Sequence, residues 1–494
     1  MRVRTLLMLS CCVCIPCAGA FADRLIPEHG KYSESYLSDW SELPSAVELT
    51  RRDDADYEAL VEVKGEDVRR RFIDRDEVRL SGDRSIVRWE DPECDKYAHT
   101  LYYFRNCERV IIEDMVINQA DPDWRASSTF FFESCGRVEI RNSYLAGTSG
   151  RAFIRIEGSE EYFVDRVEIS GLVYEEVGGP ARCGPGIWVN NGAGYEPETG
   201  RQRYISDDNA RDLRFGVIQN SYFHDYGLTD PVHNHDAILF HAPADGIVFN
   251  CWFEDWEADS ALDNSHRRND EAYQNHLHRT ERCVFKDCHR VKTNGAEGSP
   301  SCSLLWCNNL YVDSSLTDYH VGWENWRVHE TYVFTRGKGY FHVMHYRDGK
   351  KLFRNCLLHS AVRQSDIYES MGTTPNQDIH ELDPDYFMYL MPEPRRWLYP
   401  RTDNTPTIET WEQWRAEGFD EHSTLTDLDP RFVDADAGDY RLLPDSPAAG
   451  AGTPEMLTAT ALRPAVTHDF FGAPRPDPPG CGAFEVAESR ADEQ

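Results

Sequence analysis

Carboxylates, imidazoles and cationic side chains gather near the middle of the sequence, and these groups can move protons in general acid and base catalysis. Two carboxylates that lie side by side need a cation, a shared proton or a basic neighbour. A cluster of such groups is therefore more informative than any one member. The residues that we predict to take part in catalysis are Asp236, Asp259, Asp263, His235, His266, Arg267 and Lys292.

Further residues around this group could contact a substrate or a cation. The side chains that we predict to bind a substrate are His233, His241, Arg268, Trp188 and Trp256. Calcium requires several oxygen ligands. The carboxylates that could supply them are Asp225, Asp255, Asp236 and Asp259, so Ca²⁺ is the cofactor to test.

Two successive copies of one pattern position several of these groups. Residues 218–226 read IQNSYFHDY, and residues 248–256 read VFNCWFEDW. In each copy an Asn precedes a small residue, two bulky residues, two polar groups and an aromatic ring. If the two copies occupy equivalent corners of successive coils, the repeat places His224 over Glu254, Asp225 over Asp255 and Tyr226 over Trp256.

The strands that follow extend the alignment. Residues 236–239 align with residues 259–262, and residues 186–189 belong to the coil before. Adjacent coils lie ~4.8 Å apart, so this alignment predicts that Asp236 stacks directly on Asp259.

The position of Lys292 follows from the same kind of offset. Lys292 comes five residues after Asp287, as Asp225 comes five residues after Asn220. We therefore predict that Lys292 lies in the same vertical row of stacked residues as Asp225.

The elements that must hold these residues are short strands. The core pattern recurs at residues 140–145, 285–288 and 353–358, and β-branched and aromatic runs alternate with Gly, Asn and Asp. A repeat of this kind indicates stacked units that bury their apolar faces against one another. We predict an all-β solenoid with coils of parallel sheet.

Composition limits the possible partners. The chain has 494 residues and a net charge of −33, which excludes a nucleic-acid partner held by a global positive field. Residues 1–22 have a basic start, a short apolar run and a small-residue cleavage site, which is typical of a signal peptide. We expect a secreted or periplasmic protein. No later stretch is long and apolar enough to cross a membrane.

The domain plan follows the repeat. Residues 23–85 form an N-terminal cap in this interpretation, residues 86–360 form the coils, and residues 361–494 form the C-terminal cap. A short helix is expected over residues 407–417, capped by Thr405. We interpret the cysteines as buried thiols in preference to a disulfide framework. Cys251, Cys288 and Cys356 are expected at the same position of the repeat.

The C-terminal sequence resembles that of a known superfamily. The phrases DPRFVD at 429–434, GDYRL at 438–442, PDSPAA at 444–449 and CGAFE at 481–485 are similar to those of secreted bacterial proteins of the pectate-lyase-like superfamily. The resemblance implies a right-handed parallel β-helix with N- and C-terminal caps. It does not select a reaction, because the polygalacturonase motifs and the Lys and Arg signature of chondroitinase-B-like lyases are not found.

Three functions remain open at this point. The leading hypothesis is β-elimination of a uronic-acid polysaccharide in a groove over residues 180–345, with Asp225, Asp255 or their neighbours holding calcium. The second is hydrolysis by the pair Asp236 and Asp259. The third is a carbohydrate-binding or adhesion solenoid without catalysis. The sequence does not indicate an oligomeric state.

Overall fold

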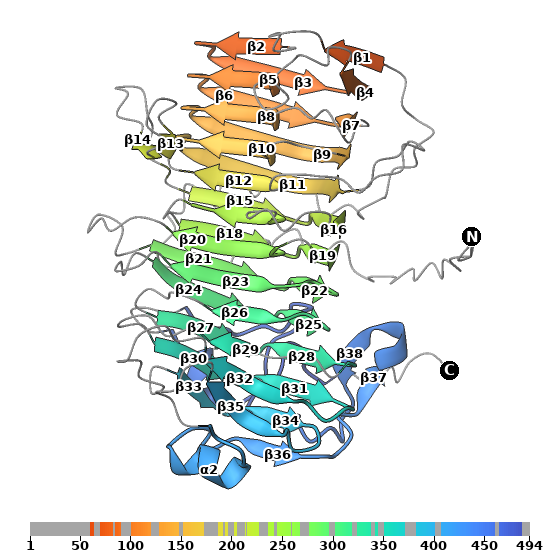
Figure 1. The fold of residues 1–494 in the computed structure, drawn as a ribbon, viewed down its shortest axis with the longest axis vertical. Coiled ribbons are helices and arrows are strands. Elements are labelled where there is room, and N and C mark those ends of the chain that lie inside the picture. The colour runs from red at the N-terminus through yellow and green to blue at the C-terminus, as the bar shows by residue number, and fades with distance from the viewer. Residues whose placement is uncertain are drawn as a thin grey trace.

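The chain forms a tall stack of coils in the computed structural model (Figure 1). The residues that this structure describes are 60–63, 70–82, 84–89, 100–119, 128–147, 152–171, 186–190, 193–195, 202–204, 213, 215–226, 236–241, 245–257, 259–266, 276–295, 302–318, 324–336, 341–343, 350–370, 382–400, 407–459 and 464–486. The predicted signal peptide lies outside them, and the first described coils begin within the segment that we expected to cap the stack.

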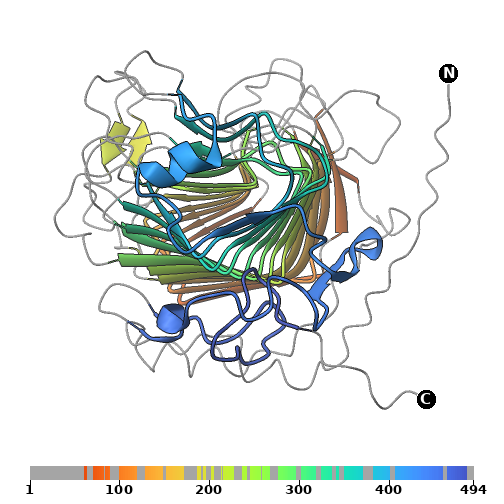
Figure 2. The ribbon, with the colours of Figure 1, turned by 90° about the horizontal axis from the view of Figure 1, so that it is seen from below.

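Two long sheets build the stack, one of 22 strands (sheet A) and one of 12 strands (sheet B). All pairings within these two sheets are parallel, so the prediction of an all-β parallel solenoid is confirmed. Viewed along the stack, successive strands superimpose in columns (Figure 2). Small antiparallel pairs join β13 (Ala193–Tyr195) to β14 (Gln202–Tyr204) and β37 (Phe432–Asp434) to β38 (Asp439–Leu442).

Sheet A contains two columns. Column 1 consists of β3 (Glu77–Ser81), β6 (Arg109–Glu113), the first halves of β9 (Arg137–Gly147) and β11 (Glu161–Ser170), β15 (Phe215–Gln219), β18 (Asp245–Phe249), β21 (His276–Glu281), β24 (Cys302–Cys307), β27 (Glu324–Val328), β30 (Lys350–Arg354) and β33 (Leu382–Asp385). Column 2 consists of β1 (Leu60–Val63), β4 (Arg84–Trp89), β7 (Val116–Gln119), the second halves of β9 and β11, β16 (Tyr222–Tyr226), β19 (Trp252–Trp256), β22 (Val284–Lys286), β25 (Leu310–Val312), β28 (Thr331–Phe334), β31 (Leu357–Ser360), β34 (Met388–Leu390) and β36 (Thr424–Thr426).

Sheet B supplies one strand to each coil. Its strands are β2 (Arg70–Ile73), β5 (Thr100–Arg105), β8 (Ser128–Glu133), β10 (Ala152–Glu157), β12 (Ile187–Asn190), β17 (Ile238–Phe240), β20 (Leu262–His266), β23 (Val291–Gly295), β26 (Leu316–Asp318), β29 (Phe341–Val343), β32 (Asp366–Ser370) and β35 (Arg396–Pro400).

The corner between columns 1 and 2 explains the recurring Asn. Asn220, Asn250 and Asn355 have φ angles of 50°, 51° and 56°, in the left-handed region that Asn adopts more readily than most residues. The side-chain amide of Asn250 donates to Asn220 over 2.7 Å, and that of Asn220 donates to Asp165 over 2.8 Å. The amides therefore link successive coils as well as turning the chain.

A second left-handed corner ends column 2, and it corrects one alignment. Glu254 pairs with Lys286 in register, so Asp287 falls beside Asp255 and does not occupy the Asn corner. Lys292 consequently lies on β23 of sheet B. The prediction that it stacks in the same row as Asp225 is wrong.

Aromatic rings stack inside the coils at the spacing of the strands. Phe223 and Phe253 have ring centroids 4.9 Å apart, and Phe285 follows at 4.8 Å from Phe253. The buried thiols agree with the interpretation of structural cysteines, although Cys283 and not Cys288 shares the slot after the corner with Cys251. The free cysteines among the described residues are Cys107, Cys135, Cys251, Cys283, Cys288, Cys307, Cys356 and Cys481.

The described residues from 407 to 486, here called the C-terminal segment, close the lower end of the stack. The helix α2 (Trp411–Ala416) begins at Thr410, whose side chain and that of Gln413 form a capping box, so the predicted cap at Thr405 is wrong. Trp414 is fully buried, and its ring stacks on Tyr368 at 5.0 Å. This tryptophan therefore anchors the cap to the last coils.

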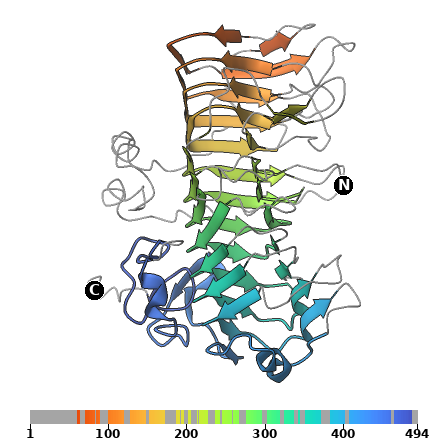
Figure 3. The ribbon, with the colours of Figure 1, turned by 90° about the vertical axis from the view of Figure 1, so that its left-hand side faces the viewer.

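The rest of the C-terminal segment lies against the outer faces of columns 1 and 2 in the lower coils (Figure 3). Apolar contact joins Val284 and Leu310 of column 2 to Tyr440 and Phe484. Within the described part of the chain, no helix has the length and apolar character needed to span a membrane.

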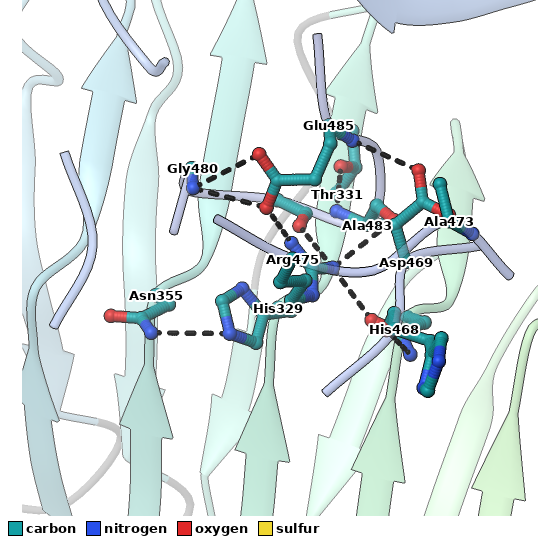
Figure 4. Close-up of polar contacts among 12 residues, drawn as sticks. His329, Thr331, Asn355, His468, Asp469, Ala473, Arg475, Gly480, Ala483 and Glu485 are labelled. Atoms are coloured by element: carbon teal, nitrogen blue, oxygen red, sulfur yellow. Dashed lines mark hydrogen bonds and ion pairs between the residues drawn. The ribbon is translucent and has the colours of Figure 1, made fainter. Parts of the chain in front are cut away.

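One buried arginine ties this segment to the coils (Figure 4). Arg475 forms an ion pair with Glu485 and donates to the Asn308 side chain over 2.7 Å. Burial raises the pKa of Glu485, which the Arg475 charge opposes. The pair is far from solvent, so losing one partner leaves an uncompensated charge.

We predict that Arg475→Met lowers the free energy of unfolding by about 3–5 kcal/mol, because Glu485 is left buried without its cation. Chemical denaturation of purified protein measures this change. The double variant Arg475→Met with Glu485→Leu should recover much of the loss. Equal stability of the wild type and the single variant would contradict this role.

Candidate functional site

A continuous row of side-chain positions crosses the outer face of sheet B, and we call it the outer file. It joins ten strands in register, one residue from each. Ile238 and Leu262, which precede members of the row, belong to the core, so alternation places the row on the opposite face. Its members are Tyr103, Phe131, Arg155, Trp188, Leu239, Asp263, Lys292, Thr317, His342 and Glu369.

The outer file brings together two of the predicted catalytic residues. Asp263 on β20 pairs in register with Lys292 on β23, and the Asp263 side chain is buried. Opposite charges at directly paired positions of neighbouring strands attract each other. Thr317 and His342 continue the row on β26 and β29.

Trp188 and His241 also lie together on this face. The Trp188 indole Nε1 donates to His241 Nδ1 over 3.2 Å, and the two rings meet edge to face at 5.7 Å. Both were predicted to bind substrate. Trp188 is two strands away from Asp263, with Leu239 between them.

The predicted stacking of Asp236 on Asp259 is wrong by one residue. Ile238 pairs with Leu262, and the backbone N–H of Ala237 donates to Ser260 O over 2.9 Å, so Asp236 falls beside Ser260. Asp236 is fully buried, whereas Asp259 forms an ion pair with Arg290 at 3.6 Å.

Trp256 does not lie on a surface that a substrate could reach. Its side chain is fully buried, and its ring stacks on Tyr226 at 4.4 Å inside the coils. The left-handed backbone at Asp255 resets the alternation of side chains just before it. The predicted contact of Trp256 with substrate is therefore wrong.

A second group of ionisable residues, the column 2 cluster, lies on the outer face of column 2. Its centre is His224, whose Nδ1 lies 2.6 Å from Asp225 and whose Nε2 lies 2.9 Å from Glu168. Burial alone would lower the pKa of His224, but the two carboxylates outweigh it and the pKa is raised. The cluster therefore favours an imidazolium.

Further members extend the column 2 cluster over the next two coils. Tyr222 donates its hydroxyl to Glu254 over 3.0 Å, and Lys286 donates to the other oxygen of Glu254 over 2.5 Å. As the repeat predicted, His224 pairs with Glu254 in register. Burial and the nearby carboxylates of Glu254, Asp287 and Asp225 raise the pKa of Asp255.

The described side chains do not form a metal site. Among the residues that the structure describes, no three His, Cys, Asp or Glu side chains lie close enough to hold a metal ion. Asp225, a predicted calcium ligand, is engaged by the His224 ring. Calcium binding stays a prediction without a set of ligands, and no step below depends on it.

Several predicted residues cannot be placed. His233, His235, Arg267 and Arg268 lie outside the described residues. For His266 the structure describes only the backbone position on β20, where His266 pairs in register with Gly295.

Sequence reasoning missed Arg155 and Phe131. The signal was present, since AFIRIE at 152–157 aligns with STFFFE at 128–133 and places Arg155 beside Phe131. His224 was aligned correctly with Glu254, but its partner Glu168 comes from an earlier coil separated by a long insertion.

No model of a known protein family matches the chain, and no curated protein matches it.

We predict that His224 stabilises the fold most in acid. Its folded pKa is raised above the unfolded value, so its contribution is present below about pH 6.5 and is lost as pH rises through the folded pKa. The difference in free energy of unfolding between wild type and His224→Gln should therefore be larger at about pH 5.5 than at about pH 9.

His359 provides a control of opposite sign for this experiment. Burial lowers its pKa, so His359→Gln should cost more stability at the higher pH. The same pH dependence in both variants would contradict the assignment of His224.

Proposed function

We propose that the protein cleaves an acidic polysaccharide by β-elimination on the outer face of sheet B. The observation that carries the proposal is the outer file itself, in which Asp263, Lys292 and His342 follow one another within four neighbouring strands. On the other side of Asp263 the same row contains Trp188 and Arg155. Cationic groups and rings of this kind suit a chain of uronic-acid sugars.

Within the outer file, the spacing of carboxylates favours elimination over hydrolysis. Glycoside hydrolases hold two carboxyl groups ~5–5.5 Å or ~6.5–9.5 Å apart. The carboxylates of the outer file, Asp263 and Glu369, are four strand spacings apart, or ~19 Å. A cation and an imidazole lie between them, and these are the groups that elimination needs.

In the proposed reaction, Lys292 neutralises the carboxylate of a uronic-acid residue, which makes the proton on C5 more acidic. His342 removes that proton as the base, since imidazole is the side chain that most often acts in general base catalysis. The electron pair forms the C4–C5 double bond, the bond from C4 to the glycosidic oxygen breaks, and that oxygen takes up a proton from solvent.

Asp263 has a positioning role in this scheme. Asp263 is buried at the position paired in register with Lys292, and in this scheme Lys292 serves as the cation and not as the base. Lys292 and His342 are two strand spacings apart along the outer file, or ~10 Å from backbone to backbone. The signal-peptide interpretation agrees with an extracellular polymer.

Hydrolysis is the second candidate, and one observation favours it. Asp225 and Asp255 occupy equivalent left-handed positions one coil apart, and the pKa of Asp255 is raised. Two carboxyl groups with different pKa values can share the roles of acid and base. This reaction would take place at the column 2 cluster, away from the outer file.

We predict that a screen against acidic and neutral polysaccharides will separate these functions. Ultraviolet absorbance and reducing ends should rise together on a uronic-acid polymer, because elimination creates a double bond with each new chain end. Reducing ends without absorbance would mean hydrolysis. Binding without either signal would support a non-catalytic solenoid, and parallel assays with calcium and with chelator test the metal.

Variants then locate the reaction. We predict that Lys292→Gln and His342→Gln each lower kcat by about 10²-fold or more, because each removes a group that acts on the reacting atoms. Lys286→Gln is the matched control, since Lys286 belongs to the column 2 cluster. Loss of activity in Lys286→Gln or Asp255→Asn, with Lys292→Gln active, would move the site to that cluster.

A further inference from the structure

Arg155 is held in one orientation on the outer face of β10. Its guanidinium lies 4.3 Å from the centre of the Phe131 ring and 5.2 Å from that of the Trp188 ring. Glu157 accepts a hydrogen bond from its Nε over 2.8 Å, and the same ion pair brings its Nη2 to 2.6 Å from the Glu157 carboxylate. Two rings and one carboxylate therefore fix a side chain that is otherwise long and mobile.

This arrangement leaves one end of the guanidinium for a ligand. Glu157 takes the edge formed by Nε and Nη2, and 15% of the Arg155 side chain is exposed. An arginine presents five N–H donors in a rigid fork, so the Nη1 end can still donate to an anion. Because the fork is already oriented, little further conformational freedom is lost on binding.

The rings beside Arg155 extend the surface along the stack. Tyr103 and Phe131 have ring centroids 5.3 Å apart, and the Arg71 guanidinium lies 5.6 Å from the Tyr103 ring. Burial and the neighbouring Glu133 raise the pKa of Tyr103, so its hydroxyl stays neutral. Rings and cations thus lie next to one another over β2 and the first strands of the outer file.

Trp188 is oriented in turn by His241. The indole N–H is engaged by His241 Nδ1, which fixes the plane of the indole next to the guanidinium. A flat indole face beside a fixed cation suits a sugar ring that carries a carboxylate.

We propose that Phe131, Arg155 and Trp188 form a subsite that binds one uronic-acid residue of the polymer, with its carboxylate at Arg155 and its ring against Trp188. The identity of the polymer rests on the proposed function. The subsite lies on the N-terminal side of Asp263, three strand spacings away, or ~14 Å. It therefore acts on substrates long enough to reach beyond the reacting bond, and it selects charged chains over neutral ones.

The test compares Arg155→Gln with wild type on a uronic-acid polymer and on the same polymer with its carboxyl groups reduced to alcohols. Arg155→Gln should weaken binding of the acidic polymer, and raise its KM, by about tenfold or more, with kcat unchanged. Binding of the reduced polymer should not change. Trp188→Ala should weaken binding of both polymers, because it removes the surface for the sugar ring.

Two controls keep the result interpretable. Arg109→Gln removes an arginine that pairs with Glu139 at 2.8 Å on the outer face of column 1, and it should leave polymer binding unchanged. Arg155→Lys keeps the charge but loses the fork, so its binding should fall between those of wild type and Arg155→Gln. Melting curves of all variants confirm that the coils are intact.

Failure of this subsite differs from failure of the proposed function. Binding of the acidic polymer can be measured by calorimetry without turnover. If the protein binds the polymer through Arg155 but does not cleave it, the subsite is supported and the proposed enzymatic function is overturned. Equal binding by wild type and by a folded Arg155→Gln would overturn the subsite. So would an equal loss of binding for the acidic and the reduced polymers.

Discussion

The in-register pairing of parallel strands is the constraint on which the rest of the structure depends. Neighbouring coils share every backbone hydrogen bond of the sheets, so each residue has one partner above and one below at a spacing of ~4.8 Å. Residues of one kind then recur in vertical rows. The amides of Asn220 and Asn250, and the rings of Phe223 and Phe253, are rows of this kind.

The same constraint arranges the outer surface. Rows on the outer faces need not repeat one residue type, so a row can change from rings to cations to carboxylates along the stack. On sheet B the row passes from Phe131 through Arg155 to Asp263, and on column 2 a row holds His224, Glu254 and Lys286. Two outer faces with different chemistry thus come from one backbone plan, and function depends on which residue each strand places in the row.

Sequence reasoning reached the fold and the Asn corner because both repeat at short range. It paired His224 with Glu254 correctly, but it shifted Asp236 by one residue relative to its true partner. The segments that lead into β17 and β20 differ in length, and the sequence does not show how many residues each turn contains. Lys292 was misplaced because Asp287 resembles the Asn of the other corner, and both corners require a left-handed residue. Trp256 was taken for a surface ring because the reversal of alternation at Asp255 leaves no mark in the residue types.

The bond between Arg475 and Asn308 joins residues that are 167 positions apart in the chain. Coils can add one after another through contacts between neighbours, as in other solenoids. The C-terminal segment cannot dock until the strands it covers are already stacked, and closing so long a loop is slow compared with adding a coil. The topology therefore sets the order of assembly. The coils form one after another, and the C-terminal segment docks last, which makes the stepwise folding of the coils cooperative.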